Sequence, residues 1–379
     1  TTFMIKRSNM SIQAGLVGLP NVGKSTLFNA LTRSSVPAQN YPFCTIDPHV
    51  ACSSVPDPRI PQLQAWYESK KTLPAVMEFV DIAGLVAGAA SGQGLGNKFL
   101  SNIREVDIIL HVLRCFNDPD ITRDMPLDPF GDYQIIVSEL MIKDLESVTK
   151  RIAKIDNLKR SHSLSGADRK TLEDEQRLME RVEQALNHKT ADDVYNLLAA
   201  SDLRTIPLLC AKRSLIIANI AEDQLDDKAY ANDPAYQLLI TTFGADRVIP
   251  ISARLEYELS QLSAQDAQAL MGPLGMEDKG LDKIITATYR ELGLITFFTC
   301  GPKEIHAWTI KNGTTIKQAG GCIHSDIERG FIAADVFGCN DLEAVDGKPS
   351  RLKEKGTFRT EGASYIVKDG DVINIKFNV

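Results

Sequence analysis

The sequence predicts an α/β fold in which a parallel sheet carries an inserted helical hairpin and precedes a small α+β domain. Short apolar strands alternate with helical segments on both sides of a charged, helix-prone stretch, a pattern typical of parallel sheets. Near residue 304, short strands and turns replace long helices, and 379 residues are too many for one compact core. We therefore expect a sheet domain at 11–132 and 201–303, an insertion at 133–200 and a C-terminal domain at 304–379.

The expected sheet domain can be followed strand by strand. Residues 12–18 (IQAGLVG) predict a short strand, and 24–33 (KSTLFNALTR) have helical spacing. Further strands are expected at 75–84 (AVMEFVDIAG), 214–219 (SLIIAN) and 247–252 (RVIPIS), and 99–116 predicts a helix that leads into a strand from Ile108 to Val112. Because such sheets bind ligands at the carboxyl ends of their strands, the loops after these strands are candidate sites.

The insertion at 133–200 shows two apolar seams of helical spacing, separated by a polar break at 160–169. This pattern predicts a helical hairpin with one buried seam and solvated outer faces. It is consistent with a spacer and also with an arm that binds a partner. The seam residues are Leu145, Val148, Ile152 and Ile155 before the break, and Met179, Val182 and Leu186 after it.

The C-terminal segment predicts mixed strands and helices. HAWTIKNGTTIKQAG (306–320) contains a strand, an Asn-Gly turn and a second short element, and SDIERGFIAADVF (325–337) has a helix-like pattern. YIVKDGDVINIKFNV (365–379) predicts a closing hairpin with Ile373, Ile375, Phe377 and Val379 on one face. The basic run at 351–359 (RLKEKGTFR) is consistent with a solvated loop or with a local RNA contact.

Composition limits the functional classes. The formal charge of −7 argues against binding nucleic acid by bulk electrostatics, so we expect no sequence-specific DNA partner. No apolar run approaches the roughly 20 residues of a membrane span, and the first residues lack the apolar stretch of a signal peptide. The seven scattered Cys fit reduced thiols in the cytoplasm better than a disulfide framework.

The sequence GLPNVGKS at 18–25 matches G-x-x-x-x-G-K-[ST] and lies between an expected strand and helix. In such a loop Gly18 and Gly23 let the backbone amides face a phosphate, and the helix N-terminus adds positive potential. Lys24 is expected to contact the β- and γ-phosphates, and the Ser25 hydroxyl to bind Mg²⁺. The full loop of nucleotide-binding candidates is Gly18, Asn21, Val22, Gly23, Lys24, Ser25 and Thr26.

Two further elements fit the same chemistry. Asp81 and Gly84 form a D-x-x-G pattern at the end of an expected strand. There the carboxylate can hold Mg²⁺ through water, and the Gly84 amide can bond the γ-phosphate. Between the two motifs, Thr45 in NYPFCTIDP is the candidate that closes over the nucleotide and gives its hydroxyl to Mg²⁺.

Together these segments resemble the YchF-type, Obg-like ATPases. The resemblance rests on GLPNVGKST (18–26), NYPFCTIDP (40–48), DIAGLVAGAASGQGLGNKFL (81–100), HVLRCF (111–116) and NIAE (219–222). It implies a P-loop NTPase (G-domain) fold with the hairpin inserted and a C-terminal TGS-like β-grasp domain. It also implies Mg²⁺-dependent hydrolysis of ATP rather than GTP, a cytoplasmic location, and contact with the ribosome through the helical arm or the C-terminal domain.

The string Asn219-Ile220-Ala221-Glu222 stands where nucleotide switches usually carry Asn-Lys-x-Asp. An Asp carboxylate accepts two hydrogen bonds from guanine, and the longer Glu222 cannot sit in the same place without shifting. Ile220 can pack on either purine, and the Asn219 amide can pair with N6 and N7 of adenine. The residues alone indicate that the guanine-recognition motif is altered, and they leave open a GTPase of the same fold. The resemblance favours ATP. Ser252 and Ala253 should frame the base edge.

Catalysis is less clearly encoded. Leu85 stands where many switch GTPases have a Gln that orients water. The resemblance favours His111 as the residue that positions water, with Lys24 and Gly84 stabilising the phosphate, and Gln93 is a weaker alternative. Asn21 resembles the P-loop Asn of relatives activated by K⁺. A slow, nucleotide-dependent regulatory module also stays open, because an aliphatic Leu85 cannot orient water.

Overall fold

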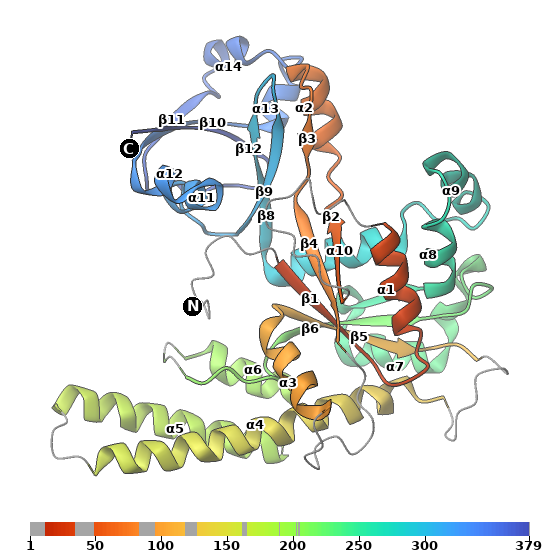
Figure 1. The fold of residues 1–379 in the computed structure, drawn as a ribbon, viewed down its shortest axis with the longest axis vertical. Helices are drawn as coiled ribbons and strands as arrows, with labels where there is room; N and C mark the ends of the chain where they lie inside the picture. The colour runs from red at the N-terminus through yellow and green to blue at the C-terminus, as the bar shows by residue number, and fades with distance from the viewer. Residues whose placement is uncertain are drawn as a thin grey trace.

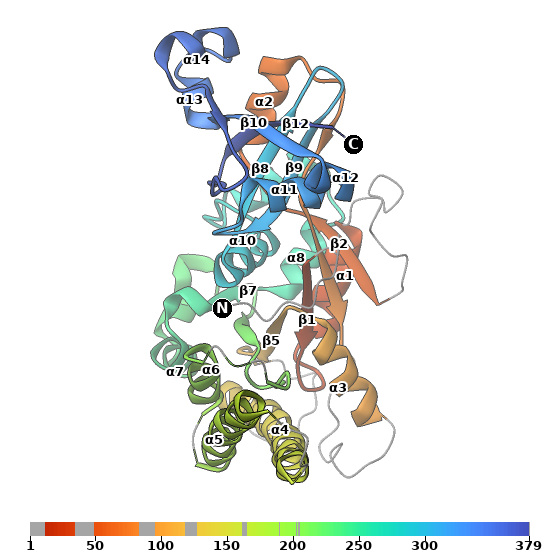
Figure 2. The ribbon, with the colours of Figure 1, turned by 90° about the vertical axis from the view of Figure 1, so that its left-hand side faces the viewer.

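The computed structural model describes residues 12–34, 49–82, 95–117, 127–160, 165–188, 190–201, 203 and 205–378. In Figure 1 a central sheet lies between a projecting helical hairpin at one end and a second sheet at the other. Figure 2 shows the same three parts along the long axis from the side. No helix in these described ranges has the length and apolar character that crossing a bilayer requires.

The first sheet has the strand order β2-β4-β1-β5-β6-β7. All neighbouring pairs are parallel except β2 with β4, which is antiparallel. The strands are β1 (Ile12–Val17), β2 (Val50–Ser54), β4 (Val76–Asp81), β5 (Ile108–Arg114), β6 (Arg213–Asn219) and β7 (Val248–Ile251). The α/β fold predicted from the alternation of strands and helices is therefore confirmed.

Helices cover both faces of this sheet because alternate strand residues point to opposite sides. On β5, Leu110 and Val112 join the core beneath α1 (Lys24–Arg33) and α10 (Gly280–Leu292). Ile109 joins the opposite core with α3 (Leu95–Glu105), and Leu113 packs with α7 (Pro234–Phe243). The shorter helices α8 (Ala253–Leu259) and α9 (Ala264–Met271) and the 3₁₀ helices η3 (Asp226–Asn232) and η4 (Ala245–Arg247) complete the domain.

The insertion folds as the helical hairpin that its apolar seams predict. It consists of α4 (Pro129–Lys159), α5 (Gly166–His188) and α6 (Ala191–Ala199). Val148, Ile155, Met179 and Val182 are fully buried between the helices. The first helix begins at Pro129 rather than 133, because the Asp128 carboxylate accepts a hydrogen bond from the Gly131 amide and caps it.

The second sheet has the order β11-β10-β12-β8-β9-β3. Its strands are β3 (Thr72–Leu73), β8 (Leu294–Cys300), β9 (Ile305–Lys311), β10 (Phe331–Gly338), β11 (Arg359–Glu361) and β12 (Asp371–Phe377). Around it lie α2 (Arg59–Tyr67), α11 (Ile316–Ile323), α12 (Ser325–Arg329), α13 (Cys339–Glu343) and α14 (Pro349–Lys355). Because β8 belongs to this sheet, the C-terminal domain begins before the expected boundary at 304.

Two local predictions in this domain are wrong. The helix-like segment 325–337 is helical only as far as Arg329, because Ala334 and Val336 are buried in a strand paired with β12. The closing hairpin at 365–379 does not form. Instead β12 pairs with β10 and β8, and Ile366 makes only an isolated bridge to Thr315. Pairing with β10 and β8 gives β12 more main-chain hydrogen bonds than a local hairpin would.

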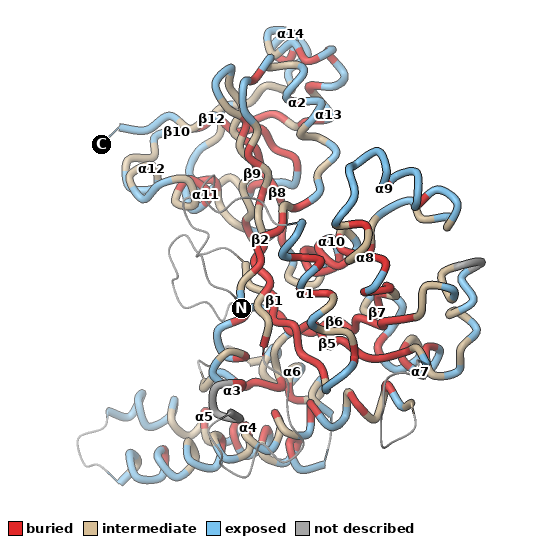
Figure 3. Tube along the Cα trace, turned by 45° about the vertical axis from the view of Figure 1, so that its right-hand side comes forward, coloured by how far each residue is buried: buried red, intermediate tan, exposed pale blue. Residues whose placement is uncertain are grey.

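Figure 3 shows buried segments in the central strands and also in β8 and β9 of the second sheet. One apolar cluster accordingly contains Leu16 and Phe79 of the first sheet together with Phe298 and Ile305 of the second. The two sheets therefore share a core.

Candidate functional site

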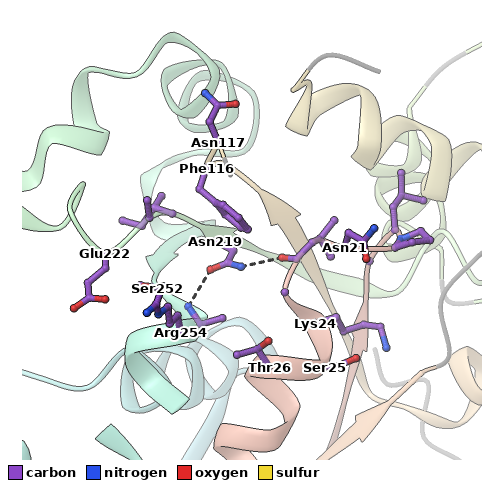
Figure 4. Close-up of a pocket in the computed structure, with 18 of the residues that line it drawn as sticks. Asn21, Lys24, Ser25, Thr26, Phe116, Asn117, Asn219, Glu222, Ser252 and Arg254 are labelled. Carbon is purple, nitrogen blue, oxygen red and sulfur yellow. Dashed lines mark hydrogen bonds between the residues drawn. The ribbon is translucent and has the colours of Figure 1, made fainter. Parts of the chain in front are cut away.

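A cavity of about 1180 Å³ opens at the carboxyl ends of β1, β5, β6 and β7. This is the edge at which parallel sheets bind ligands, and the volume is at the upper end of small-molecule sites. Its walls come from four loops that are far apart in the sequence (Figure 4). The lining residues are Gly18 to Thr26, Phe116, Asn117, Asn219 to Asp223, Ser252 to Arg254, and Leu274.

The loop between β1 and α1 has the backbone that a phosphate cradle needs. Asn21 and Gly23 have φ of 63° and 90°, so the chain curls through left-handed conformations before the helix starts. A side chain at Gly18 would meet the Val112 carbonyl oxygen at 2.8 Å. The first turn of α1 has no side-chain cap, so its amides and the positive end of the helix dipole face the cavity.

Lys24 and Asp81, predicted separately from two motifs, lie in direct contact. The Lys24 Nζ donates to the Asp81 carboxylate, and both side chains are largely buried. Lys24 and Ser25 line the cavity and Ser25 is exposed there, whereas Asp81 does not line it and is connected to the site through its contact with Lys24. The hydroxyl of Ser25 and the carboxylate of Asp81 are oxygen ligands of the kind that Mg²⁺ prefers.

Asn219 makes two contacts that the sequence did not predict. Its amide is buried, with Nδ2 donating to the Val22 carbonyl and Oδ1 accepting from the Ala253 amide, each at 2.9 Å (Figure 4). Each end of the amide can make one more hydrogen bond, so the expected pairing with adenine stays a prediction. Asn219 also ties the phosphate loop to the loop after β7. Gly23 must be glycine here, since a Cβ would strike the Asn219 amide.

The other expected base-reading residues are at the end of the cavity away from Lys24. Glu222 lines it and is partly exposed, and Figure 4 shows its carboxylate on the side opposite the phosphate loop. Ile220 also lines it but is only 2% exposed, so most of its side chain lies in the core. The Ser252 hydroxyl caps α8 by accepting from the Leu255 amide, so Ser252 shapes the wall as the helix N-cap.

Among the lining residues that sequence reasoning did not name as site residues are Phe116, Asn117 and Arg254. Phe116 lies two residues after the end of β5. The guanidinium of Arg114 lies 4.9 Å from its ring centre, and Arg114 Nε donates to the Phe116 carbonyl at 3.0 Å. An aromatic ring fixed in this way offers a flat apolar surface to a base. The available signal was its position just after a strand whose carboxyl end faces the site.

His111 lies apart from this cavity. It is 2% exposed in β5, its ring meets Tyr133 edge-on at 4.9 Å, and its own cavity of about 10 Å³ contains no residue of the phosphate loop. Burial, with a contribution from the charge of Arg247, lowers the pKa of His111 to about 3. In this structure β5 directs the imidazole beneath α4, away from the cavity, and the role of His111 in positioning water stays a prediction.

Four residues named in the sequence, Thr45, Gly84, Leu85 and Gln93, lie outside the described residues. Among the described residues, no cluster of three or more His, Cys, Asp or Glu could hold a metal ion. A divalent cation at this site would therefore depend on oxygen atoms of the nucleotide as well as on Ser25 and Asp81.

Two family models match the chain. Residues 13–161 match MMR_HSR1, described as 50S ribosome-binding GTPase, and residues 294–378 match YchF-GTPase_C, described as a protein of unknown function. The second match begins at the first residue of β8, in agreement with the domain boundary that the second sheet sets.

Similar proteins extend along nearly the whole chain. The ribosome-binding ATPase YchF of Bacillus subtilis is 42% identical over 98% of this chain and all of its own length. The Obg-like ATPase 1 of Oryza sativa is 40% identical over 99% of this chain and 94% of its own. Among solved structures, the Schizosaccharomyces pombe YchF GTPase matches with a TM-score of 0.83, at 34% identity over 98% of this chain and 99% of that one. The names of these proteins differ on the nucleotide, since the curated relatives are called ATPases and the solved structure a GTPase.

Proposed function

Since the chain belongs to the YchF family of Obg-like ATPases, we propose that it hydrolyses ATP to ADP and phosphate in the cavity at the edge of the first sheet. One observation carries this proposal. A single cavity joins the phosphate loop at 18–26 to the 219–222 string, which stands where related switches read the base. A nucleoside triphosphate is a ligand that would contact the phosphate loop and the base-binding string at the same time.

Within this cavity the phosphate loop supplies most of the binding. The amides of the loop and of the α1 N-terminus face the β-phosphate, and Lys24 takes the β- and γ-phosphates in place of Asp81. Mg²⁺ supplies charge neutralisation between the phosphates. Ser25 would hold it directly and Asp81 through water, and the proposal adds Thr45 and the Gly84 amide as partners on the γ-phosphate side.

Lys24→Ala tests the phosphate loop. It removes the one ammonium group that the motif supplies, and we expect loss of ATP affinity and turnover by at least about 100-fold, within the range reported for single charge-stabilising groups. Lys143→Ala is the matched control, because Lys143 makes a surface ion pair with Glu146 on the hairpin. Unchanged affinity and turnover in Lys24→Ala would refute the proposed site.

The base is read without a guanine-specific Asp. Asn219 keeps one donor and one lone pair for the base, and adenine would also meet the Phe116 ring, the exposed edge of Ile220 and backbone groups near Glu222. A carboxylate aimed at N1 of adenine would repel its lone pair, so Glu222 must lie beside the base rather than under its edge. Competition between ATP and GTP at equal concentration tests this, and tight preference for GTP would favour the GTPase alternative.

We propose the ribosome as the macromolecular partner and the cytoplasm as the location. The support is the name of the curated relatives and the match to a family described as 50S ribosome-binding. The helical hairpin and the C-terminal domain project from opposite ends of the first sheet and are the candidate contact surfaces (Figure 1). Pelleting with ribosomes in the presence of a non-hydrolysable ATP analogue or ADP tests this, and absence from the pellet in both states would refute it.

Asn21 supports a further proposal about a monovalent cation. Its left-handed backbone, with φ of 63°, places it at the mouth of the phosphate loop. We propose that its side-chain oxygen helps hold K⁺ beside the triphosphate. Turnover should then be faster in K⁺ than in Na⁺ buffers of equal ionic strength, and equal rates would exclude the cation site.

A further inference from the structure

The β2–β4 ribbon connects the nucleotide cavity to the second sheet. At the cavity end, the Asp81 amide donates to the His49 carbonyl at 2.9 Å, and the Asp81 carboxylate binds Lys24. At the far end, the Val55 amide donates to the Ala75 carbonyl at 2.8 Å. Between these last two residues the chain leaves the first sheet to form α2 and β3, which lie beside β9 in both ribbon views (Figures 1 and 2). We call residues 55–75 the excursion.

The excursion is built into the C-terminal domain. Thr72 of β3 pairs in parallel register with Ile305 of β9, and the Ile305 amide donates to the Lys71 carbonyl at 2.9 Å. The indole ring of Trp66 in α2 lies directly against Gly347, where even a Cβ would collide with it. Main-chain hydrogen bonds and close packing therefore hold this segment as an edge of the second sheet.

Arg59 joins the excursion to the C-terminal chain through charge. Its Nη2 and Nε donate to the Asp57 carboxylate at 2.7 and 2.8 Å, and its Nη1 donates to Asp369 at 2.7 Å. Asp369 in turn accepts from the Thr296 amide at 2.8 Å, at the centre of β8. The guanidinium lies 5.0 Å from the ring centre of Phe298. Although burial opposes the charged form, the two carboxylates hold the pKa of Arg59 above its ordinary value.

The apolar contacts around this joint leave little room for independent movement. Leu63 of α2 is fully buried in the cluster that also contains Phe79 of β4 and Phe298 of β8. Domains that share a close-packed core move together, because such packing is not continuously deformable. A change in the contacts of Asp81 at the end of β4 would therefore be transmitted to the second sheet through the excursion.

We propose that the β2–β4 ribbon and its excursion couple the nucleotide cavity to the C-terminal sheet, with Arg59 as the positioning residue at the joint. The inference rests on the proposed nucleotide site. When Mg²⁺ and ATP are bound, Lys24 would contact a phosphate and Asp81 would help to hold the metal ion. The Lys24–Asp81 ion pair at the end of β4 would then be broken. By linkage, a partner that holds the C-terminal sheet changes nucleotide affinity by the same factor.

Hydrogen exchange of the full chain tests this coupling, with and without a non-hydrolysable ATP analogue and Mg²⁺. Exchange in residues 294–311 should slow by about fivefold or more in the native protein, the lower end of usual coupling factors. Arg59→Gln should reduce that change to less than about twofold. Asp369→Asn should do the same, and its remaining side-chain oxygen can still accept from Thr296.

Lys376→Gln is the matched control, because Lys376 makes a 2.7 Å ion pair with Asp335 within the same sheet and away from α2. It should keep the full nucleotide-dependent change. Calorimetric titration of the same samples separates the two proposals. If the native protein binds the analogue but exchange at 294–311 is unchanged, the coupling is refuted and the nucleotide site stands. A full response in both Arg59→Gln and Asp369→Asn also refutes it. If the native protein binds no analogue, the proposed function fails and the coupling fails with it.

Discussion

Asn219→Asp is the sharpest test of how the nucleotide site is held together. The substitution keeps the size of the side chain and the hydrogen bond from the Ala253 amide, but it puts a carboxylate oxygen against the Val22 carbonyl. Leaving the buried Val22 carbonyl without its donor costs about 1–3 kcal/mol. With the side chain only 3% exposed, water cannot compensate. We therefore expect a loss of about 1–3 kcal/mol.

This loss can appear in the unfolding free energy or in ATP affinity, and both should be measured, by urea unfolding and by calorimetric titration. At about 1.4 kcal/mol per tenfold change, a loss expressed wholly in binding weakens ATP affinity by roughly 5- to 140-fold. Asn187→Asp is the matched control, because Asn187 donates to the Glu183 carbonyl on an exposed helix surface. If Asn219→Asp matched this control in both measurements, Asn219 could not be the link between the two loops.

Three further predictions concern the core, the hairpin and the joint between the sheets. Gly347→Ala should lower the unfolding free energy by about 2–4 kcal/mol through left-handed strain and a clash with Trp66. Gly313→Ala, also at positive φ but with open space around it, should cost only about 1 kcal/mol. Equal losses in urea unfolding would contradict the close packing. Burial raises the pKa of Asp144 above its ordinary 3.8, although amide hydrogen bonds oppose this. The folded state therefore favours the protonated carboxyl. The stability linked to protonation is complete below pH 3.8 and is lost as the pH rises through the folded pKa. The unfolding free energy of the native protein relative to Asp144→Asn should accordingly fall from pH 4 upward, and a difference that rises with pH would contradict the sign. His111→Phe keeps a ring in the same space and should leave turnover within about twofold. Because it removes an unpaired buried nitrogen, it should also add up to about 1 kcal/mol to the unfolding free energy. A large loss of turnover with normal ATP binding would instead support a catalytic role for the imidazole.

Sequence reasoning was most successful where the chemistry is local. The phosphate loop at 18–26 could be recognised because its glycines, Lys24 and Ser25 act through backbone shape and spacing within one turn. The hairpin seams and the strands of the first sheet were also predictable, because apolar periodicity reports directly on which face is buried. The end strand β12 was located but paired wrongly, since its partners β10 and β8 are distant in sequence.

By itself, then, the sequence determined the class of fold, the phosphate loop and the family. Only the tertiary structure decided what individual polar groups do. Asn219 was expected to read the base, and the structure shows that it also binds the Val22 carbonyl, 197 residues away in sequence. The resemblance favoured His111 as the residue that positions water, yet the direction of β5 buries its side chain beneath α4. The physical reason is common to both: a buried donor or acceptor takes whichever partner the fold brings within about 3 Å, and local sequence does not specify that partner.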